Sequence, residues 1–353
     1  TTSLRFSLDG YETRVIEEAG TRFTEFTYEN EGHLLEIGKP AFPQFSRMII
    51  IPNEGSVRYT VRSSKQAVLQ NTIPYPAQQL QVESDPRAIP FEIDDAWYRQ
   101  GTPYPQQMIE ISDPMIMRDY RVVFVTINPF QYDPATQAVT VIHDVELDVT
   151  VSGSGGVNAL RSNERHSVSF DQFAKSAALN YAETRDDDFE PPCYLIIYPS
   201  NDDVLTTLEV LADWKHQKGH EVHLASTMET GTSDVAIKNY IQTAYDTWDN
   251  APDFVMLAGD ADGGFSIPTH SIDQGYGDHY YTLLDGTDLL PELFIGRLSF
   301  DTVFELQTIV SKILNYEKQP YMLSTEWYEQ ACLVGDTSSS GQSTIDTNVQ
   351  IGN

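Results

Sequence analysis

The spacing of apolar residues changes near the middle of the chain, and this change most limits what the chain can fold into. Up to residue 152, short apolar or alternating runs are separated by turn-forming residues. From residue 193 onward, continuous apolar runs alternate with helix-like segments. The two patterns are typical of different architectures. We therefore predict two folding units joined by a connecting segment, for which 353 residues are sufficient.

The first unit, residues 1–152, is predicted to be an all-β domain of the sandwich or barrel type. Helical periodicity is nearly absent, and the frequent prolines suit strand edges and loops rather than helices. The candidate strands are residues 22–28, 33–37, 47–51, 56–61, 107–111, 120–127 and 139–151.

Residues 153–190 are predicted to be the linker. A Ser/Gly stretch at 152–156 is typical of a flexible joint, and an acidic run at 186–188 precedes two consecutive prolines. A weakly helical patch lies near residues 170–181. We expect the domain boundary, and a protease-sensitive segment, in this region.

The second unit, residues 191–353, is predicted to be an α/β domain with a parallel sheet. Residues 193–198 (CYLIIY) form an apolar run of the kind found in strands covered on both faces. The further strands are expected at 220–225, 253–258, 293–297 and 331–335, and the helices at 203–218, 235–248 and 302–317. Gly219 is placed to end the first helix. Ligands of such sheets bind beyond the carboxyl ends of the strands, where Asp260 and Asp336 are expected.

The charge of the chain excludes some classes of partner. There are 52 acidic and 22 basic residues, so the formal net charge is −30. Such a field repels phosphate backbones, so we expect no nucleic-acid partner. No apolar stretch reaches 18 residues, so we expect no membrane-spanning helix. The acidity is consistent either with simple solubility or with binding of hard cations such as Ca²⁺.

The densest group of potential ligands lies between Asp260 and Glu292. Asp260 follows a buried strand, and residues 285–292 (DGTDLLPE) form an acidic loop that contains glycine. Hard cations need several converging oxygens, from carboxylates and from backbone carbonyls of an irregular turn. An acidic loop that faces a strand-end aspartate meets this need. An Asp-Gly turn and a solvated acidic loop remain as alternatives.

The other candidate residues are weaker candidates for metal binding or catalysis. His216, His220 and His223 have spacing that could suit zinc, but Gly219 separates a helix end from a strand and scatters the side chains. Cys193 and Cys332 fall in expected buried strands, where cysteines are usually unreactive. No nucleophile elbow or P-loop is present. We therefore assign no catalytic residue within this chain.

The order of several motifs resembles the gingipain-type cysteine peptidases. Within residues 193–340 these motifs are FVMLAGD at 254–260, Ile267-Pro268, DGTDLLPELFIGRLS at 285–299, and Tyr316-Glu317. In residues 1–152 the pieces RMIIIP at 47–52 and YRVVFVTINPFQY at 120–132 are similar to the β-rich pro-domain of this family.

The resemblance implies a caspase-like fold and a secreted or cell-surface bacterial endopeptidase that acts on proteins or peptides. In the family, the catalytic Cys–His dyad follows the region matched here. The resemblance therefore implies that this chain has the carboxyl-terminal remainder of its own catalytic domain as a partner. The sequence has no Gly-His-Gly stretch, and the chain alone is expected to be inactive. The resemblance also implies structural calcium, bound by the side chains of Asp260, Asp288 and Glu292 and the backbone carbonyls of Asp285 and Leu290.

The resemblance further implies that the pro-domain blocks the cleft until it is cut away, and Arg99 is a candidate for a residue that mimics the substrate. The specificity residue is expected near residues 342–346. The end at Asn353 is consistent with self-processing. The main alternative is a non-catalytic surface or adhesion module that keeps the fold and the calcium site, and a cytosolic hydrolase is a third possibility.

Overall fold

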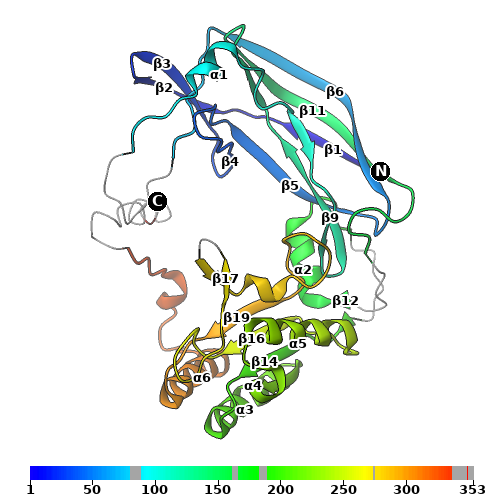
Figure 1. Cartoon of the computed structure of the whole chain (residues 1–353), viewed down its shortest axis with the longest axis vertical. Helices are drawn as coiled ribbons and strands as arrows, with labels where there is room; N and C mark the ends of the chain where they lie inside the picture. Colours follow the sequence, from blue (N-terminus) through cyan, green and yellow to red (C-terminus); the bar gives the residue numbers. More distant parts are fainter. Residues whose placement is uncertain (80–88, 161–165, 183–188, 273–274, 336–347, 349–353) are drawn as a thin grey trace.

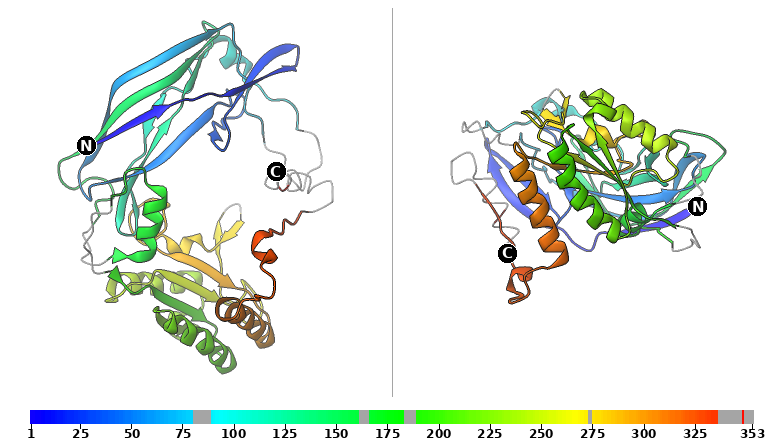
Figure 2. Two further views of the ribbon diagram at one scale, coloured as in Figure 1. Left: turned by 180° about the vertical axis from the view of Figure 1, so that it is seen from behind. Right: turned by 90° about the horizontal axis from the view of Figure 1, so that it is seen from below.

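The computed structural model describes residues 1–79, 89–160, 166–182, 189–272, 275–335 and 348. The chain forms a β-rich half and an α/β half, and the helix α2 (Val168–Ala177) lies between them (Figure 1). The view from behind shows the same division (Figure 2). None of the described helices is both long and apolar enough to cross a membrane.

The β-rich half contains two antiparallel sheets and a hairpin. In one sheet, β11 pairs with β6 along one side and with β1 and β10 along the other. In the other sheet, the order is β4-β5-β9-β7, with β8 paired to β9. The strands β2 and β3 form the hairpin. The bounds are β1 Thr2–Ser7, β2 Glu12–Glu18, β3 Thr21–Thr27, β4 Gly32–His33, β5 Pro43–Ile51, β6 Ser56–Gln70, β7 Ile109–Ile111, β8 Met115–Met117, β9 Tyr120–Ile127, β10 Phe130–Asp133 and β11 Ala138–Ser152.

Side chains from both antiparallel sheets form one core. Alternating residues of β9 and β11, such as Val123, Val125, Leu147 and Val149, point into this core. Alternation of this kind is what a sheet with one buried face requires. The half is not strictly all-β, because Asp95–Gln100 forms the short helix α1, whose amino end is capped by Asp94.

Several strands differ from the expectation. The strands β1, β2, β8 and β10 were not predicted, and the strand expected at 33–37 is reduced to the two residues of β4. In the region of 33–37, Leu35 and Ile37 are exposed rather than packed against a sheet. The sequence pattern was apolar there, but none of the described strands pairs with Leu35 or Ile37.

The described part of the expected linker is packed rather than loose. The backbone N–H of Gly55 donates to Gly155 O at 2.6 Å, and a Cβ on Gly156 would lie 2.8 Å from Gly55 O. The fully buried Arg121 donates to Val157 O at 2.7 Å and to Gly55 O at 3.0 Å. The glycines therefore serve a close backbone approach as well as a turn. In α2, Phe170 and Ala174 are buried against Met48 and Val122 of the β-rich half.

The α/β half contains a four-stranded parallel sheet with the order β15-β14-β16-β19, which confirms the predicted parallel sheet. Its core elements match the predicted ones within one or two residues at each end. The bounds in this half are β12 His166–Ser167, β13 Phe189–Glu190, β14 Cys193–Tyr198, α3 Asp202–Gln217, β15 Glu221–Ser226, α4 Thr227–Thr230, α5 Asp234–Thr247, β16 Phe254–Ala258, β17 His270–Ile272, β18 Gly275–Gly277, η1 His279–Thr282, β19 Phe294–Leu298, α6 Val303–Lys318 and η2 Glu326–Glu329.

Both faces of this sheet are covered. Leu195 and Ile197 pack with α5 and η1, whereas Ile196 and Tyr198 pack with α3 and α6. The helix α3 ends as expected, because Gly219 has φ +90° and its N–H donates to His216 O at 2.9 Å.

The strand expected at 331–335 is absent from the described structure. These residues form no strand, and Leu333 and Val334 are 43% and 80% exposed. An apolar run becomes a strand only where a neighbouring strand pairs with it. None of the described strands pairs with this segment.

Candidate functional site

The described contacts between the two halves centre on the amino-terminal edge of the parallel sheet. Asp253 lies immediately before β16 and is 3% exposed. One of its carboxylate oxygens accepts the backbone N–H of Cys193 at 2.8 Å, and the other accepts the hydroxyl of Ser167, the residue that caps α2. This single carboxylate therefore ties β14, β16 and α2 together.

Arg118 of the β-rich half reaches into the same edge. It lies in the tight turn between β8 and β9, has φ +56° and is 7% exposed. Its guanidinium donates to Ala251 O at 2.9 Å, Pro252 O at 2.5 Å and Glu292 O at 3.2 Å. It also lies 3.9 Å from Asp253 and 5.1 Å from the ring centre of Tyr245. A planar, forked cation is suited to several carbonyl acceptors at once.

The predicted acidic loop lies at this same edge. Glu292 is fully buried, and its Oε2 accepts the backbone N–H groups of Leu284 at 2.7 Å and Asp285 at 3.1 Å. Its Oε1 is also buried and has no hydrogen-bond partner among the described residues. Burial, together with the charges of Asp288 and Asp285, raises the pKa of Glu292 to about 8. The loop thus holds a buried carboxyl group, one oxygen of which has no hydrogen-bond partner among the described residues.

Asp288 of the loop contacts the β-rich half. Its Oδ2 accepts the N–H of Ile116 at 2.9 Å and the side-chain amide of Asn158 at 2.8 Å, and its Oδ1 accepts the N–H of Leu290 at 2.9 Å. On the other side of the loop, Lys238 donates to Leu283 O, and burial lowers the pKa of this lysine to about 8. The loop is therefore held in place from both halves.

Asp260 does not join this loop, which corrects the expected arrangement. The register pairs Phe254 with Phe294 and Ala258 with Leu298, so Asp260 follows the carboxyl end of β16 while Glu292 precedes the amino end of β19. A strand of five residues spans roughly 16 Å, whereas the oxygens around one Ca²⁺ each lie about 2.4 Å from it. A single ion cannot bind both side chains. The carboxylate of Asp260 instead accepts the hydroxyl of Ser299 at 2.7 Å.

The remaining candidate ligands of the loop suit a hard cation only with backbone oxygens. Among the described residues, no group of three or more His, Cys, Asp or Glu side chains is arranged to hold a metal ion. The unpartnered oxygen of Glu292 and the nearby carboxylates of Asp285 and Asp288 are donors of the right kind. Backbone carbonyls from the loop, such as those of Asp285 and Leu290, would have to supply the rest.

The candidate histidines and cysteines do not form a shared metal site among the described residues. Nδ1 of His216 lies 3.1 Å from His220 O, and Nε2 of His223 lies 2.9 Å from the Glu221 carboxylate. Cys193 is buried in β14, and burial raises the pKa of its thiol to about 12. Cys332, expected in a buried strand, is instead exposed. Asp336 and the expected specificity region at 342–346 lie outside the described residues.

Arg99 is not in a loop. It occupies the last turn of α1 and is exposed. The figures place α1 at the end of the β-rich half that is remote from the parallel sheet (Figures 1 and 2). Its described position therefore gives no support to a contact with a substrate cleft.

Sequence reasoning missed Arg118, Asp253 and Ser167. Each lies at a junction between elements far apart in the chain, so no local pattern marks them. One weak signal was present: Arg118-Asp119 separates two apolar runs, as the turn of a hairpin does.

A β-rich half whose buried Arg118 contacts the amino edge of a parallel α/β sheet defines a two-part protein with its halves joined at that edge. Two family models match the chain in this order: Propeptide_C25 over residues 1–188 and Peptidase family C25 over residues 187–352. The first alone covers more than half of the chain. The chain belongs to this family of gingipain-like cysteine peptidases, with its pro-domain and the amino-terminal part of its catalytic domain.

Named relatives agree with the family. The chain is 26% identical over 333 residues to gingipain R2 of Porphyromonas gingivalis, covering 90% of this chain and 44% of the relative. It is 26% identical over 367 residues to Lys-gingipain of the same species, covering 98% of this chain and 21% of the relative. The chain thus spans less than half of these relatives. Among solved structures, a complex of the RgpB pro- and mature domains from P. gingivalis matches with a TM-score of 0.46 and 22% identity, covering 51% of this chain and 90% of that one.

Proposed function

We propose that this chain is the amino-terminal portion of a secreted cysteine endopeptidase zymogen with a caspase-like catalytic domain. The observation that carries the proposal is the order of the two family matches, a propeptide followed by a peptidase, over nearly the whole chain. The chain contributes the pro-domain and the first four strands of the α/β sheet. The catalytic Cys and His are supplied by the remainder of the catalytic domain, and the substrates are proteins or peptides.

The position of the described interface bears on what the pro-domain does. Arg118, Asp288 and Ser167 join the halves at the amino edge of the sheet. Active centres of parallel α/β sheets lie at the opposite, carboxyl edge. These contacts are therefore suited to holding the α/β half in its folded form, and a block of the cleft would need contacts beyond them.

The test uses the whole protein that contains this chain. We expect peptide hydrolysis after removal of the pro-domain, inhibited by iodoacetamide, because the thiolate is the nucleophile of such enzymes. Replacing the downstream cysteine by serine should abolish hydrolysis, whereas Cys193→Ser and Cys332→Ser should leave it unchanged. A whole protein without hydrolysis, and without a Cys–His pair near the strand ends, would instead support the non-catalytic surface module.

We also propose that Ca²⁺ binds the loop of residues 285–292. The side chains of Asp288 and Glu292 and the carbonyls of Asp285 and Leu290 would hold it, and the ion would compensate the unpartnered Oε1 of Glu292. Asp260 is a ligand of a separate ion or of none, because it lies at the other edge of the sheet.

Thermal unfolding with and without Ca²⁺ tests this site. Ligand binding to the folded state alone stabilises it by about 2.7 kcal/mol at a concentration of 100 times Kd. The calcium-dependent rise in Tm should disappear in Asp288→Asn and Glu292→Gln and persist in Asp260→Asn, with Mg²⁺ as the control ion. A rise in Tm that survives in Glu292→Gln would rule out the loop site.

A further inference from the structure

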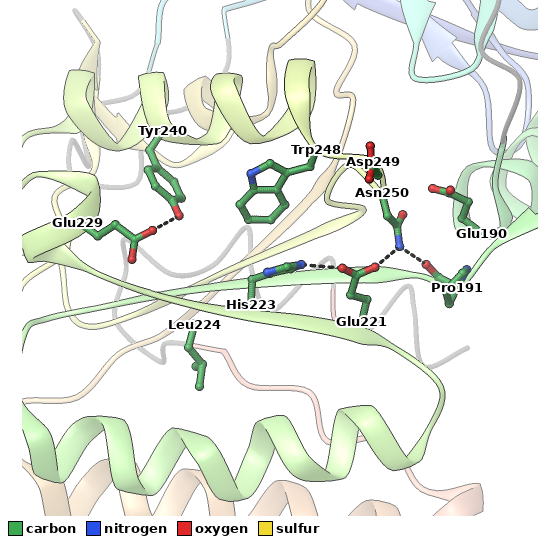
Figure 3. Close-up of a pocket in the computed structure, with 10 residues that line it drawn as sticks. All are labelled: Glu190, Pro191, Glu221, His223, Leu224, Glu229, Tyr240, Trp248, Asp249 and Asn250. Atoms are coloured by element: carbon green, nitrogen blue, oxygen red, sulfur yellow. Dashed lines mark hydrogen bonds and ion pairs between the residues drawn. The ribbon is translucent and has the colours of Figure 1, made fainter.

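A cavity lies along the outer edge of the parallel sheet, away from the acidic loop. Its volume is about 680 Å³, and it runs beside β15 under the helix α5 (Figure 3). The residues that line it are Glu190, Pro191, Glu221, His223, Leu224, Glu229, Tyr240, Trp248, Asp249 and Asn250. It extends from Pro191 and Asn250 near the amino end of β15 to Glu229 beyond its carboxyl end.

The charge of this cavity has one sign. Four of its ten residues are Asp or Glu, and none is Lys or Arg. Glu221 accepts hydrogen bonds from Asn250 at 2.8 Å and interacts with His223 at 2.9 Å. The hydrogen bond from Asn250, together with that from His223, lowers the pKa of Glu221, so this carboxylate stays ionised. A chain with a net charge of −30 does not offset this field from elsewhere.

Aromatic rings line the cavity beside the carboxylates (Figure 3). The ring centres of Trp248 and His223 are 4.3 Å apart, and Tyr240 stands edge-on to Trp248 at 6.4 Å. The hydroxyl of Tyr240 donates to Glu229 and orients that carboxylate. Rings beside carboxylates favour a long cationic side chain, whose methylene groups pack on the rings while its head meets the oxygens.

The strand that borders the cavity is an edge strand. Among the described strands, β15 pairs only with β14, so its other side is free to pair with a further strand. Its six residues span roughly 20 Å, which suits an extended segment of about six residues.

We propose that this groove binds an extended peptide segment that adds to β15 and places Lys or Arg side chains beside the rings of Trp248 and Tyr240, with each charged head at the carboxylate of Glu221 or of Glu229. Main-chain pairing with β15 supplies affinity, and the acidic, aromatic cavity supplies preference for a basic residue. The four acidic residues that line the groove disfavour acidic segments. The proposal does not rest on peptidase activity, because binding alone is measured.

The probe is the peptide acetyl-Thr-Lys-Thr-Lys-Thr-amide, titrated into the whole protein in its catalytically inactive Cys→Ser form. We expect binding that shifts the fluorescence or the NMR resonances of Trp248. The analogue with Gln in place of Lys should bind at least about tenfold more weakly, because the charge-assisted contacts are lost. An analogue N-methylated on the backbone keeps its charge and should also bind weakly, because it cannot pair with β15.

Matched variants locate the site. Glu229→Gln and the double variant Glu221→Gln/Glu229→Gln should weaken binding of the Lys peptide, the double by about tenfold. The control is Asp213→Asn, which also removes one negative charge, but from an exposed residue of α3 on the other face of the sheet. This variant should leave the affinity for the Lys peptide unchanged. Equal affinity in all these variants, or equal affinity for the Lys and Gln peptides, would overturn the proposal. Unchanged binding of the N-methylated peptide would overturn addition to β15.

Discussion

At the scale of single residues, the surroundings decide what a side chain can do. The chain has two cysteines, of which Cys193 is buried and Cys332 is exposed to solvent. Cys193 lies in the central strand β14 with its backbone N–H bonded to Asp253, and burial raises the pKa of its thiol to about 12. Cys332 lies on an exposed segment of the α/β half.

We therefore predict selective alkylation. In the native chain at neutral pH, iodoacetamide should modify Cys332 within the experiment and leave Cys193 unmodified, because the reactive species is the thiolate. Mass spectrometry of peptides after alkylation, with and without urea, measures this. Cys193 should react only after unfolding, and its rapid reaction in the native chain would contradict the burial described here.

At the scale of elements, one carboxylate links α3 to α6. Glu317 of α6 interacts with Lys215 at 3.0 Å, with Lys218 at 2.9 Å and with the indole N–H of Trp214 at 2.8 Å. Burial opposes the ionised form of Glu317, but the hydrogen bonds from Lys218, Lys215 and Trp214 outweigh it and lower the pKa to about 2. The link stabilises the folded chain while Glu317 is ionised.

The sign of the pH effect follows from this lowered pKa. The stabilisation is present above the ordinary pKa near 4.5 and is lost as pH falls toward 2, because protonation then favours the unfolded chain. We predict that Glu317→Gln lowers the free energy of unfolding by about 1 to 3 kcal/mol at pH 7 and flattens its decrease below pH 4.5. Urea unfolding across this pH range tests it, with the exposed Glu326→Gln as control. An unaltered pH profile in Glu317→Gln would contradict the assignment.

At the scale of the whole molecule, Arg118 is the main described link between the halves. It is buried and donates to three backbone carbonyls of the α/β half. Removing the buried arginine leaves those carbonyls without this donor and the buried Asp253 without the nearby positive charge.

We predict that Arg118→Ala lowers the free energy of unfolding by roughly 2 to 4 kcal/mol. Arg118→Lys should recover only part of this loss, because an ammonium group cannot reproduce the forked geometry. The exposed Arg99→Ala serves as a control and should change stability little. Urea unfolding followed by circular dichroism measures all three, and a loss no greater than that of Arg99→Ala would show that the halves are held together elsewhere.

Local patterns sufficed for much of the α/β half. The strand at 193–198 and the helices that follow were predicted because a continuous apolar run and helical spacing can both be recognised from residues close together in the sequence. The amino end of α6 carries a capping box of Thr302 and Glu305, which is also a local signal. The strand expected at 331–335 was wrong because strand formation depends on a partner elsewhere in the molecule.

The sequence by itself determined the division into a β-rich and an α/β part, the parallel sheet, and the family resemblance, since each depends on spacing along the chain. Tertiary structure alone decided that Asp260 and Glu292 lie at opposite edges, because strand register sets distances that sequence separation does not. It alone decided that Arg118 joins the halves, and that carboxylates and rings from β15, α4 and α5 line one groove. Contacts between distant segments are set by packing, and no local pattern records them.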